Sequence, residues 1–253
     1  MTLARGFYDR PMAHRGLHDV SDGRPENSRA AILAAIQAGY GIEIDVQLSA
    51  DGAAMVFHDY ALERLTGQRG PLRLRQADDL ARVSLLGGDE GIPDLPEVLK
   101  LIDGRVPLLI EIKDQDGGMG PDVGPLEQAT AQAVRGYDGP VAVMSFNPYS
   151  VAKMAEFAPD VPRGIVTSAY RYEDWPLPRR TCDLLRDIPD YDRVGAGFIS
   201  HEMNDLSRPR VAHLKAQGAM ILCWTVRSPE EEEEAREVAD NITFEGYDAA
   251  LHP

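Results

Sequence analysis

The sequence predicts an α/β protein, a single (β/α)8 TIM barrel that spans residues 1–253 and carries a β-hairpin extension after its second strand. Short apolar runs of strand length alternate with helical segments along the whole chain. When the hairpin is counted once, the parallel strands number eight, which is the number that closes such a barrel. Ionisable residues follow several of these runs, and a parallel barrel gathers the ends of its strands at one mouth.

The first two elements are predicted from local signals. The segment Pro11–His14 has the length and apolar character of a strand. The segment Arg29–Ala38 is a helix, because Asn27 or Ser28 can cap its beginning and Gly39 can close its end.

The length of one connection decides the topology of the next two strands. The strand Gly41–Leu48 and the run Met55–His58 are separated only by a short stretch with the turn signal Asp51-Gly52. A parallel crossover needs about a dozen residues or more. The two runs must therefore form a hairpin, which folds His58 back over the barrel mouth.

The remaining segments repeat a strand–helix order. The predicted strands are Pro107–Ile112, Val141–Phe146, Gly164–Ser168, Gly197–Ser200, Met220–Thr225 and Asn241–Phe244. The predicted helices are Leu95–Leu101, Leu126–Arg135, Tyr149–Phe157, Ser207–Gln217 and Pro229–Val238. A doubly wound open sheet is the main alternative, and it is disfavoured because no glycine-rich phosphate loop follows the first strand.

Two stretches interrupt this order. Residues 65–91 are rich in Gly, Arg and Asp and are expected to form a small insertion above the barrel. Residues 169–192 form a long connection at the carboxyl face, where such loops usually shape substrate pockets. A packed excursion without function explains either stretch equally well. The run Glu230–Glu234 is expected to be a solvated helix start, since Ser228 can cap it and Pro229 fits its first turn.

The composition excludes several classes of partner. A net charge of −15 and a pI near 4.8 argue against a nucleic-acid partner or an anionic membrane surface. Cys182 and Cys223 are too few for a disulfide scaffold and are expected to be free and buried. No stretch approaches the ~18 apolar residues of a membrane span, and the first residues lack a signal-peptide core. We therefore expect a cytoplasmic protein without membrane insertion, whose oligomeric state the sequence leaves open.

Three carboxylates at strand ends predict a metal site. Side chains repeat every second residue along a strand, so Glu43 and Asp45 lie on one side of their strand, as do Glu111 and Lys113 on theirs. Glu43, Asp45 and Glu111 offer only oxygen ligands, which suit Mg²⁺ or Ca²⁺ better than zinc. Salt bridges around the rim would explain one such carboxylate, but not three beside two histidines.

The neighbouring residues predict phosphodiester chemistry. His14 and His58 are suited to proton transfer, because imidazole titrates near neutral pH. Arg15 and Lys113 add positive charge that fits a phosphate. Asp59 either orients His58 or caps the next turn. Together these residue types indicate a metal-dependent phosphodiesterase that uses two-histidine acid–base catalysis.

The motifs around these residues resemble those of the glycerophosphodiester phosphodiesterases. In chain order they are His14-Arg15-Gly16, Pro25-Glu26-Asn27-Ser28, Glu43-x-Asp45, Asp51-Gly52, His58-Asp59, Glu111-x-Lys113, Ser145-Phe146 and Trp224-Thr225-Val226. The resemblance covers most of the chain, and its N-terminal set is specific in order and spacing.

The resemblance implies a role for each matching residue. It implies a TIM barrel that binds one divalent cation through Glu43, Asp45 and Glu111. It further implies His14 and His58 as general base and general acid, although the residues alone do not assign the two steps. Arg15 and Lys113 would contact the phosphate.

The implied reaction is cleavage of a small-molecule glycerophosphodiester into sn-glycerol 3-phosphate and an alcohol, as part of lipid and glycerol metabolism. The glycerol would lie against aromatic surface, with Trp224 and Phe146 as candidates that are equally well explained as core residues.

The chain also departs from the family pattern. Ser28 and Ser49 stand where the family usually has Thr, and both keep the hydroxyl group. The last strand commonly ends in Thr-Asp-x-Pro, whereas this chain has Thr243-Phe244-Glu245-Gly246. This difference puts the eighth strand–helix loop in doubt.

Two other functions remain as alternatives. A phosphoinositide-specific phospholipase C also uses two histidines and a metal on a barrel, but this chain lacks an apolar or basic element that would face a membrane. A non-catalytic binding module would usually have lost a metal ligand or a histidine, and this sequence retains all of them.

Overall fold

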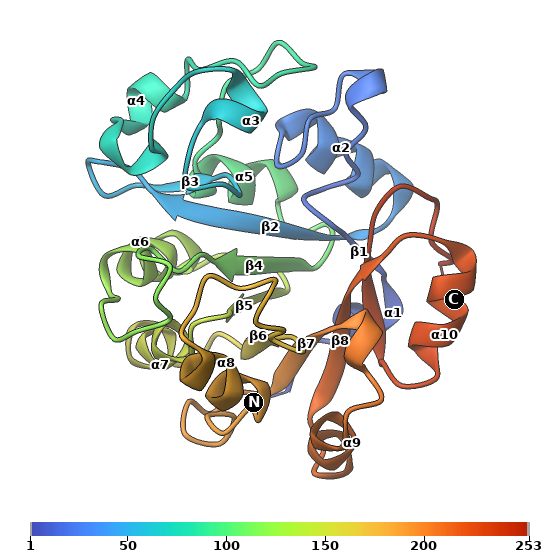
Figure 1. The fold of residues 1–253 in the computed structure, drawn as a ribbon. Helices are drawn as coiled ribbons and strands as arrows, with labels where there is room; N and C mark the ends of the chain where they lie inside the picture. Colours follow the sequence, from blue (N-terminus) through green and yellow to red (C-terminus); the bar gives the residue numbers. More distant parts are fainter. Residues whose placement is uncertain (1, 252–253) are drawn as a thin grey trace.

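A closed parallel barrel forms the centre of the computed structural model, which describes residues 2–251 (Figure 1). Its eight parallel strands are β1 (Met12–Ala13), β2 (Gly41–Leu48), β4 (Leu108–Ile112), β5 (Val141–Ser145), β6 (Arg163–Thr167), β7 (Phe198–Glu202), β8 (Met220–Val226) and β9 (Asn241–Phe244). The barrel closes because β1 pairs with both β2 and β9. The predicted fold class is therefore confirmed.

The predicted hairpin is also present, with different bounds. Strand β3 (Ala54–Val56) runs antiparallel to β2, with Val46 opposite Val56. The predicted end of this strand at His58 is wrong, because the backbone leaves the ladder after Phe57 donates to the carbonyl of Asp45 at 3.0 Å. His58 consequently lies in a loop beyond the strand.

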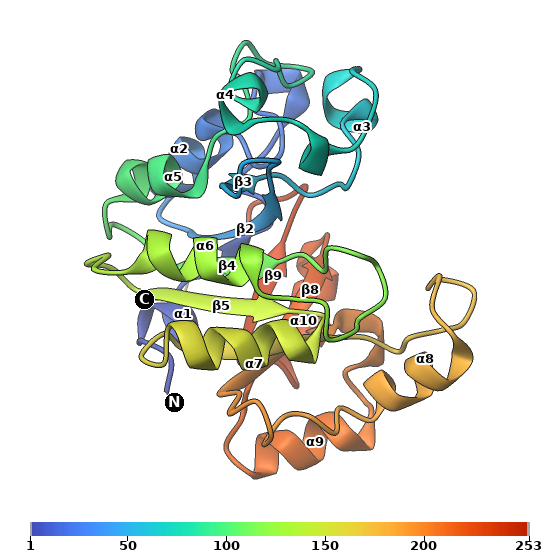
Figure 2. The same cartoon turned by 90° about the vertical axis from the view of Figure 1, so that its left-hand side faces the viewer.

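The helices lie between the strands and cover the outside of the barrel (Figures 1 and 2). Those predicted from the sequence are α2 (Arg29–Ala38), α5 (Leu95–Ile102), α6 (Pro125–Val134), α7 (Pro148–Phe157), α9 (Pro209–Ala216) and α10 (Pro229–Arg236). Ser28 caps α2 by accepting from the amide of Ala31 at 3.1 Å, and Gly39 ends it in a left-handed conformation. Ser228 caps α10 in the same way.

Several short helices were not predicted. They are α1 (Gly6–Asp9), α3 (Glu63–Thr66), α4 (Ala77–Leu80) and α8 (Arg179–Arg186). Three of them have only four residues, too few to show a helical period. Helix α8, which buries Cys182 and Leu185, lies within residues 169–192, a stretch that the sequence analysis treats as one long connection.

The two irregular stretches project beyond the carboxyl ends of the strands. The insertion after β3 has a small core of its own, formed by Met55, Phe57, Leu62, Leu72, Leu80, Val83, Leu85 and Ile92. Figure 2 shows α3 of this insertion and α8 of the long connection on the side toward which β5 points. Both stretches are thus placed where they can border a site at the mouth of the barrel.

The other end of the barrel is apolar and closed. Phe7 of α1 is fully buried against a cluster that includes Leu109, Phe198 and Leu222 from the strands. Asn241 of β9 fixes α1 by donating to the carbonyls of Phe7 and Arg10, both at 2.7 Å. The polar groups of the barrel interior are therefore gathered at the opposite mouth.

Two further expectations concern the chain as a whole. Both cysteines are free and buried, as predicted, and burial raises the pKa of the Cys223 thiol to about 12. Among residues 2–251, no helix is long and apolar enough to cross a membrane.

Candidate active site

Adjacent strands bring the three predicted metal ligands together. Asp45 of β2 lies directly opposite Glu111 of β4 in the parallel register. Glu43 lies two residues before Asp45 on β2, so its side chain points to the same side of the strand. One carboxylate oxygen from each residue lies within 4.8 Å of the other two, and all three residues are buried. This cluster has the donor atoms and spacing to hold a metal ion.

The cluster carries more negative charge than its surroundings balance. Burial raises the pKa of Glu43, and repulsion from Asp45 and Glu111 raises it further. Burial would also raise the pKa of Asp45, but Lys113, His58 and Arg15 hold it below its usual range. The Lys113 Nζ lies 2.7 Å from Glu111 Oε1 and 3.0 Å from Asp45 Oδ1.

The donor set therefore fits a hard divalent cation. Three buried carboxylates on adjacent strands supply only oxygen ligands, which Mg²⁺ and Ca²⁺ prefer. A cation placed among them would relieve the repulsion that raises the pKa of Glu43.

The turn after β1 places Arg15 over this cluster. Arg15 and Gly16 both have left-handed backbones, with φ values of 54° and 77°. At position 16 a Cβ atom would lie 2.9 Å from the carbonyl carbon of Ala31, so only glycine fits. The turn lets the Arg15 amide donate to Glu43 Oε2 at 3.0 Å. The strained backbone at Arg15 thus directs an amide N–H at Glu43, one of the predicted metal ligands.

His14 is held by an acid from the other end of the chain. Its Nδ1 lies 2.5 Å from Glu245 Oε2, and Arg227 donates to the other oxygen of Glu245 at 2.9 Å. An ionised carboxylate can only accept, so Nδ1 carries a proton and Nε2 is left for the substrate. Burial lowers the pKa of His14, although the hydrogen bond to Glu245 opposes this shift.

Sequence reasoning missed Glu245 as a site residue. It treated residues 243–246 as a departure from the family pattern, whereas Glu245 supplies the acid that binds His14. The available signal was an acid that directly follows the last strand, at the same mouth as the other ionisable residues.

His58 is held by its neighbour in the sequence. Its Nδ1 lies 2.6 Å from Asp59 Oδ1, so the interpretation that Asp59 orients His58 has a structural basis. Arg64 of α3 donates to both oxygens of Asp59, at 2.7 and 2.8 Å. The same guanidinium donates to both oxygens of Glu26, at 2.7 and 2.8 Å.

Glu26 extends this network to Arg15. Its carboxylate accepts from Arg15 Nη1 at 2.7 Å, and Arg15 Nε lies 3.4 Å from Asp45 Oδ2. Asn27, next to Glu26, donates to the same oxygen of Asp45 at 2.9 Å. An unbroken series of hydrogen bonds and ion pairs therefore runs from His58 to a predicted metal ligand. Sequence reasoning placed Glu26 and Asn27 in a family motif and considered Asn27 as a helix cap, but it gave neither of them, nor Arg64, a role in the site.

All of the predicted site residues line one hollow of about 170 Å³ at the barrel mouth. They are His14, Arg15, Glu43, Asp45, His58, Glu111, Lys113, Phe146 and Trp224. Phe146 and Trp224 meet edge to face with ring centres 5.5 Å apart, and both are partly exposed. The two aromatic residues thus border the site rather than belonging wholly to the core.

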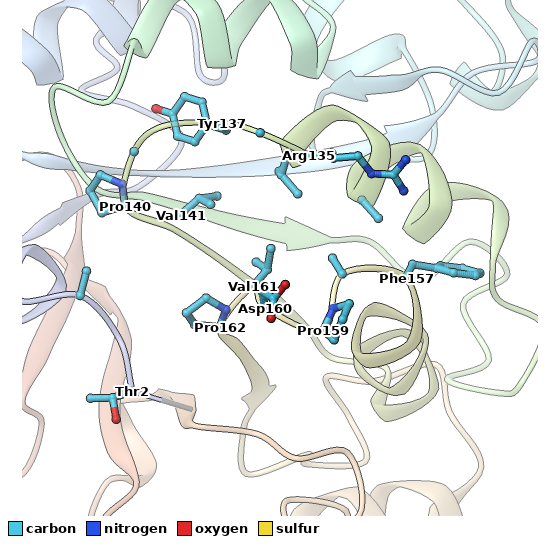
Figure 3. A pocket seen from close by; sticks show the side chains of 16 residues that line it. Thr2, Arg135, Tyr137, Pro140, Val141, Phe157, Pro159, Asp160, Val161 and Pro162 are labelled. Carbon is cyan, nitrogen blue, oxygen red and sulfur yellow. The ribbon is translucent and has the colours of Figure 1, made fainter.

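A larger hollow of about 600 Å³ lies near the amino ends of β5 and β6 (Figure 3). Its walls come from the loops around Tyr137, Pro140 and Pro159, and from Thr2 near the N-terminus. Arg135 and Asp160 are the only charged residues among the described residues that line it. Without a cluster of acids or histidines, this hollow has no evident chemistry.

Comparisons with known proteins identify the family to which the chain is similar. The model of the glycerophosphoryl diester phosphodiesterase family matches residues 14–241. A glycerophosphodiester phosphodiesterase of Caldanaerobacter subterraneus subsp. tengcongensis is 31% identical over 179 residues, which are 67% of this chain and 71% of that protein.

Solved structures share the fold. An Oleispira antarctica phosphodiesterase, in complex with the product sn-glycerol-3-phosphate, has a TM-score of 0.74 and 23% identity, and the match covers 93% of this chain and 92% of that one. A Thermotoga maritima glycerophosphodiester phosphodiesterase has a TM-score of 0.70 and 21% identity, covering 93% and 94%. The chain therefore belongs to the glycerophosphoryl diester phosphodiesterase family of phosphoric diester hydrolases.

Proposed function

We propose that this enzyme hydrolyses glycerophosphodiesters to sn-glycerol 3-phosphate and an alcohol, with the help of one divalent cation. The observation that carries the proposal is the single hollow in which three carboxylates, two histidines, an arginine and a lysine converge. We further infer that residues 1–253 act as one catalytic domain, since the family match spans residues 14–241.

Glu43, Asp45 and Glu111 would hold the cation, either Mg²⁺ or Ca²⁺. When bound, it would stabilise negative charge on the phosphoryl oxygens in the transition state. Lys113 bridges Asp45 and Glu111 in this structure. A cation bound to these two carboxylates would take the place of the ammonium group, which would then be available to contact the phosphate. Arg15 would contribute a second positive charge to the same group.

His14 fits the general base. Its lowered pKa keeps the imidazole neutral near pH 7, and its proton on Nδ1 leaves Nε2 to take a proton from the attacking hydroxyl. His58 would donate a proton from its Nε2 to the departing oxygen, while Asp59 stabilises the charged ring.

The glycerol unit would lie against Phe146 and Trp224, which present partly exposed rings to the hollow. The product named for the Oleispira structure, sn-glycerol-3-phosphate, supports glycerol 3-phosphate as the half of the substrate bound in this hollow.

A panel of glycerophosphodiesters tests the proposal, with release of glycerol 3-phosphate measured before EDTA, after EDTA and after addition of Mg²⁺ or Ca²⁺. We expect EDTA to abolish turnover and one of the two cations to restore it. Glu43→Ala should be inactive under every condition. Turnover that resists EDTA, or full activity of Glu43→Ala, would contradict the proposal.

The identity of the attacking group needs a separate measurement. Either water attacks phosphorus, or the 2-hydroxyl of the glycerol attacks first and forms a cyclic phosphate. Turnover in ¹⁸O-labelled water, combined with a search for cyclic glycerophosphate, distinguishes the two routes.

A further inference from the structure

A second set of metal-ligating groups meets outside the three-carboxylate cluster, at the Nδ1 atom of His14. It consists of His14, His18 and Glu245, and one ligand atom from each lies within 4.8 Å of the other two. Glu245 Oε2 lies 2.5 Å from His14 Nδ1 and 3.6 Å from His18 Nε2. We call this set the His–His–Glu cluster. Two imidazoles and one carboxylate are ligands that suit Zn²⁺, whereas Mg²⁺ and Ca²⁺ prefer a set of oxygens alone.

The backbone around the His–His–Glu cluster is fixed by hydrogen bonds. The amide of His14 donates to the carbonyl of Phe244 at 2.9 Å, which holds the end of β1 against the end of β9 and brings Glu245 beside it. The chain then turns at Gly16, and the amide of His18 donates to the Gly16 carbonyl at 2.9 Å. The turn after β1 thus returns a second imidazole to the acid that already holds the first.

His18 brings a nitrogen without a partner to this cluster. Its Nε2 atom is buried and has no hydrogen-bond partner among residues 2–251. The 3.6 Å to Glu245 Oε2 is longer than a hydrogen bond. A buried polar atom that lacks a partner costs free energy. A cation between His18 and Glu245 would supply that partner.

The spacing of the three groups suits a tetrahedral cation after a small adjustment. Donor atoms around a tetrahedral Zn²⁺ lie about 3.3 Å apart, given bond lengths of roughly 2.0–2.2 Å. The separation of His18 and Glu245 is already close to this value. His14 and Glu245 would have to move apart by about 0.8 Å. Arg227 donates to the other oxygen of Glu245 at 2.9 Å, which leaves Oε2 to the two imidazoles.

A hollow of about 540 Å³ gives the cluster its own access from solvent. His18 lines it together with Leu17, Val20 and Tyr247, and Val20 is 58% exposed. None of the described residues that line this hollow lines the catalytic one. A cation can therefore reach His18 without passing through the space proposed for the substrate.

We propose that the His–His–Glu cluster binds a Zn²⁺ ion and that this ion inhibits the enzyme. The inhibition rests on the proposed function, in which Nε2 of His14 accepts a proton. Zn²⁺ bound at Nδ1 releases the proton that this atom carries. The neutral ring then takes one proton from solvent at Nε2, so no net proton is exchanged. Nε2 can now donate but no longer accept, and His14 is lost as the base.

A zinc titration of the full chain tests the site without reference to activity. Calorimetry in excess Mg²⁺ or Ca²⁺ should show Zn²⁺ binding that becomes at least about tenfold weaker in His18→Gln, because one protein ligand is lost. His213→Gln is the matched control, since His213 is exposed on α9 and should not affect the affinity. Zinc bound at the three carboxylates would instead respond to Glu43→Ala and not to His18→Gln. That result, or the absence of zinc binding, would overturn the proposal.

Initial rates of glycerol 3-phosphate release test the inhibition. In excess Mg²⁺ or Ca²⁺, Zn²⁺ should inhibit the wild type, and His18→Gln should need at least about tenfold more Zn²⁺ for the same inhibition. Without Zn²⁺ the two rates should be similar. Equal inhibition of both proteins, or zinc binding that leaves turnover unchanged, would overturn the proposed inhibition. If the protein loaded with Mg²⁺ or Ca²⁺ cleaves no diester, the proposed function itself fails, while the titration still decides whether the zinc site exists.

Discussion

The two histidines of the site are held by similar groups that come from different parts of the fold. Each places Nδ1 against a carboxylate, and each carboxylate accepts from an arginine. The carboxylate of His58 is the next residue, Asp59, whereas that of His14 is Glu245, 231 positions later in the chain. The arrangement at His58 is therefore local in the sequence, whereas the same arrangement at His14 depends on closure of the barrel.

The arginines differ as well. Arg64 binds both oxygens of Asp59 and both of Glu26, and its side chain is 49% exposed. Arg227 contacts one oxygen of Glu245, and its side chain is 59% exposed. Among the described residues, only the His58 side continues, through Glu26, to Arg15. This comparison indicates that the insertion after β3 couples His58 to the predicted phosphate-binding arginine.

The largest expected effect comes from removing either imidazole. His14→Ala and His58→Ala should each lower kcat by about 10²–10⁴, the range of general acid–base catalysis. The two variants should differ on a 4-nitrophenyl ester of glycerol 3-phosphate, because this leaving group departs without a proton. We expect this ester to restore much of the activity of His58→Ala but not of His14→Ala, as measured by release of nitrophenolate. The opposite pattern would reverse the assignment of base and acid.

Changing the carboxylates should have the next largest effect. Glu245→Gln and Asp59→Asn should each lower kcat by ~10² or more, because a neutral amide no longer fixes the tautomer of its histidine. The hydrogen bond that His14 donates to Glu245 raises the pKa of His14, so its loss lowers that pKa further. The base then stays neutral at lower pH, and the acidic limb of the kcat/KM profile should move to lower pH in Glu245→Gln.

Asp59→Asn is the control for that shift, because Asp59 contacts the other histidine. Its acidic limb should stay where the wild-type limb lies. If both variants shift the limb equally, His14 is not the group that controls it.

The smallest effects are expected at the two arginines. Arg64→Lys should lower kcat/KM by about tenfold, because an ammonium group cannot reproduce the planar guanidinium group that binds the carboxylates of Asp59 and Glu26 together. Arg227→Lys should stay within about threefold, since exposed ion pairs contribute little. Steady-state kinetics at low ionic strength provides the comparison. A larger loss for Arg227→Lys would show that the His14 side, not the His58 side, depends on its arginine.

Much of the site could be predicted because its residues follow strands that have clear local patterns. Glu43, Asp45 and Glu111 alternate correctly on β2 and β4, and the short turn between β2 and β3 required a hairpin. The strand ends were less predictable. Here β3 ends at Val56, and the last backbone contact with β2 is the hydrogen bond from Phe57 to Asp45.

The residues that sequence reasoning missed share a physical property. Glu245 and Arg64 act through contacts with residues far away in the chain or in irregular segments. No periodic pattern marks such residues, because their positions follow from barrel closure and from the packing of loops.

The sequence by itself determined the strand–helix order, the family motifs and the set of ionisable groups at the barrel mouth, because strand periodicity and motif spacing are local properties. Only the tertiary structure decided which acid holds His14, how Arg64 joins His58 to Arg15, and which aromatic residues pack against Phe146. Closure of β1 against β9 brings Glu245 to His14, and packing of the connection after β6 brings Trp175 to Phe146. These are long-range contacts, and their energies depend on the complete fold rather than on any one segment.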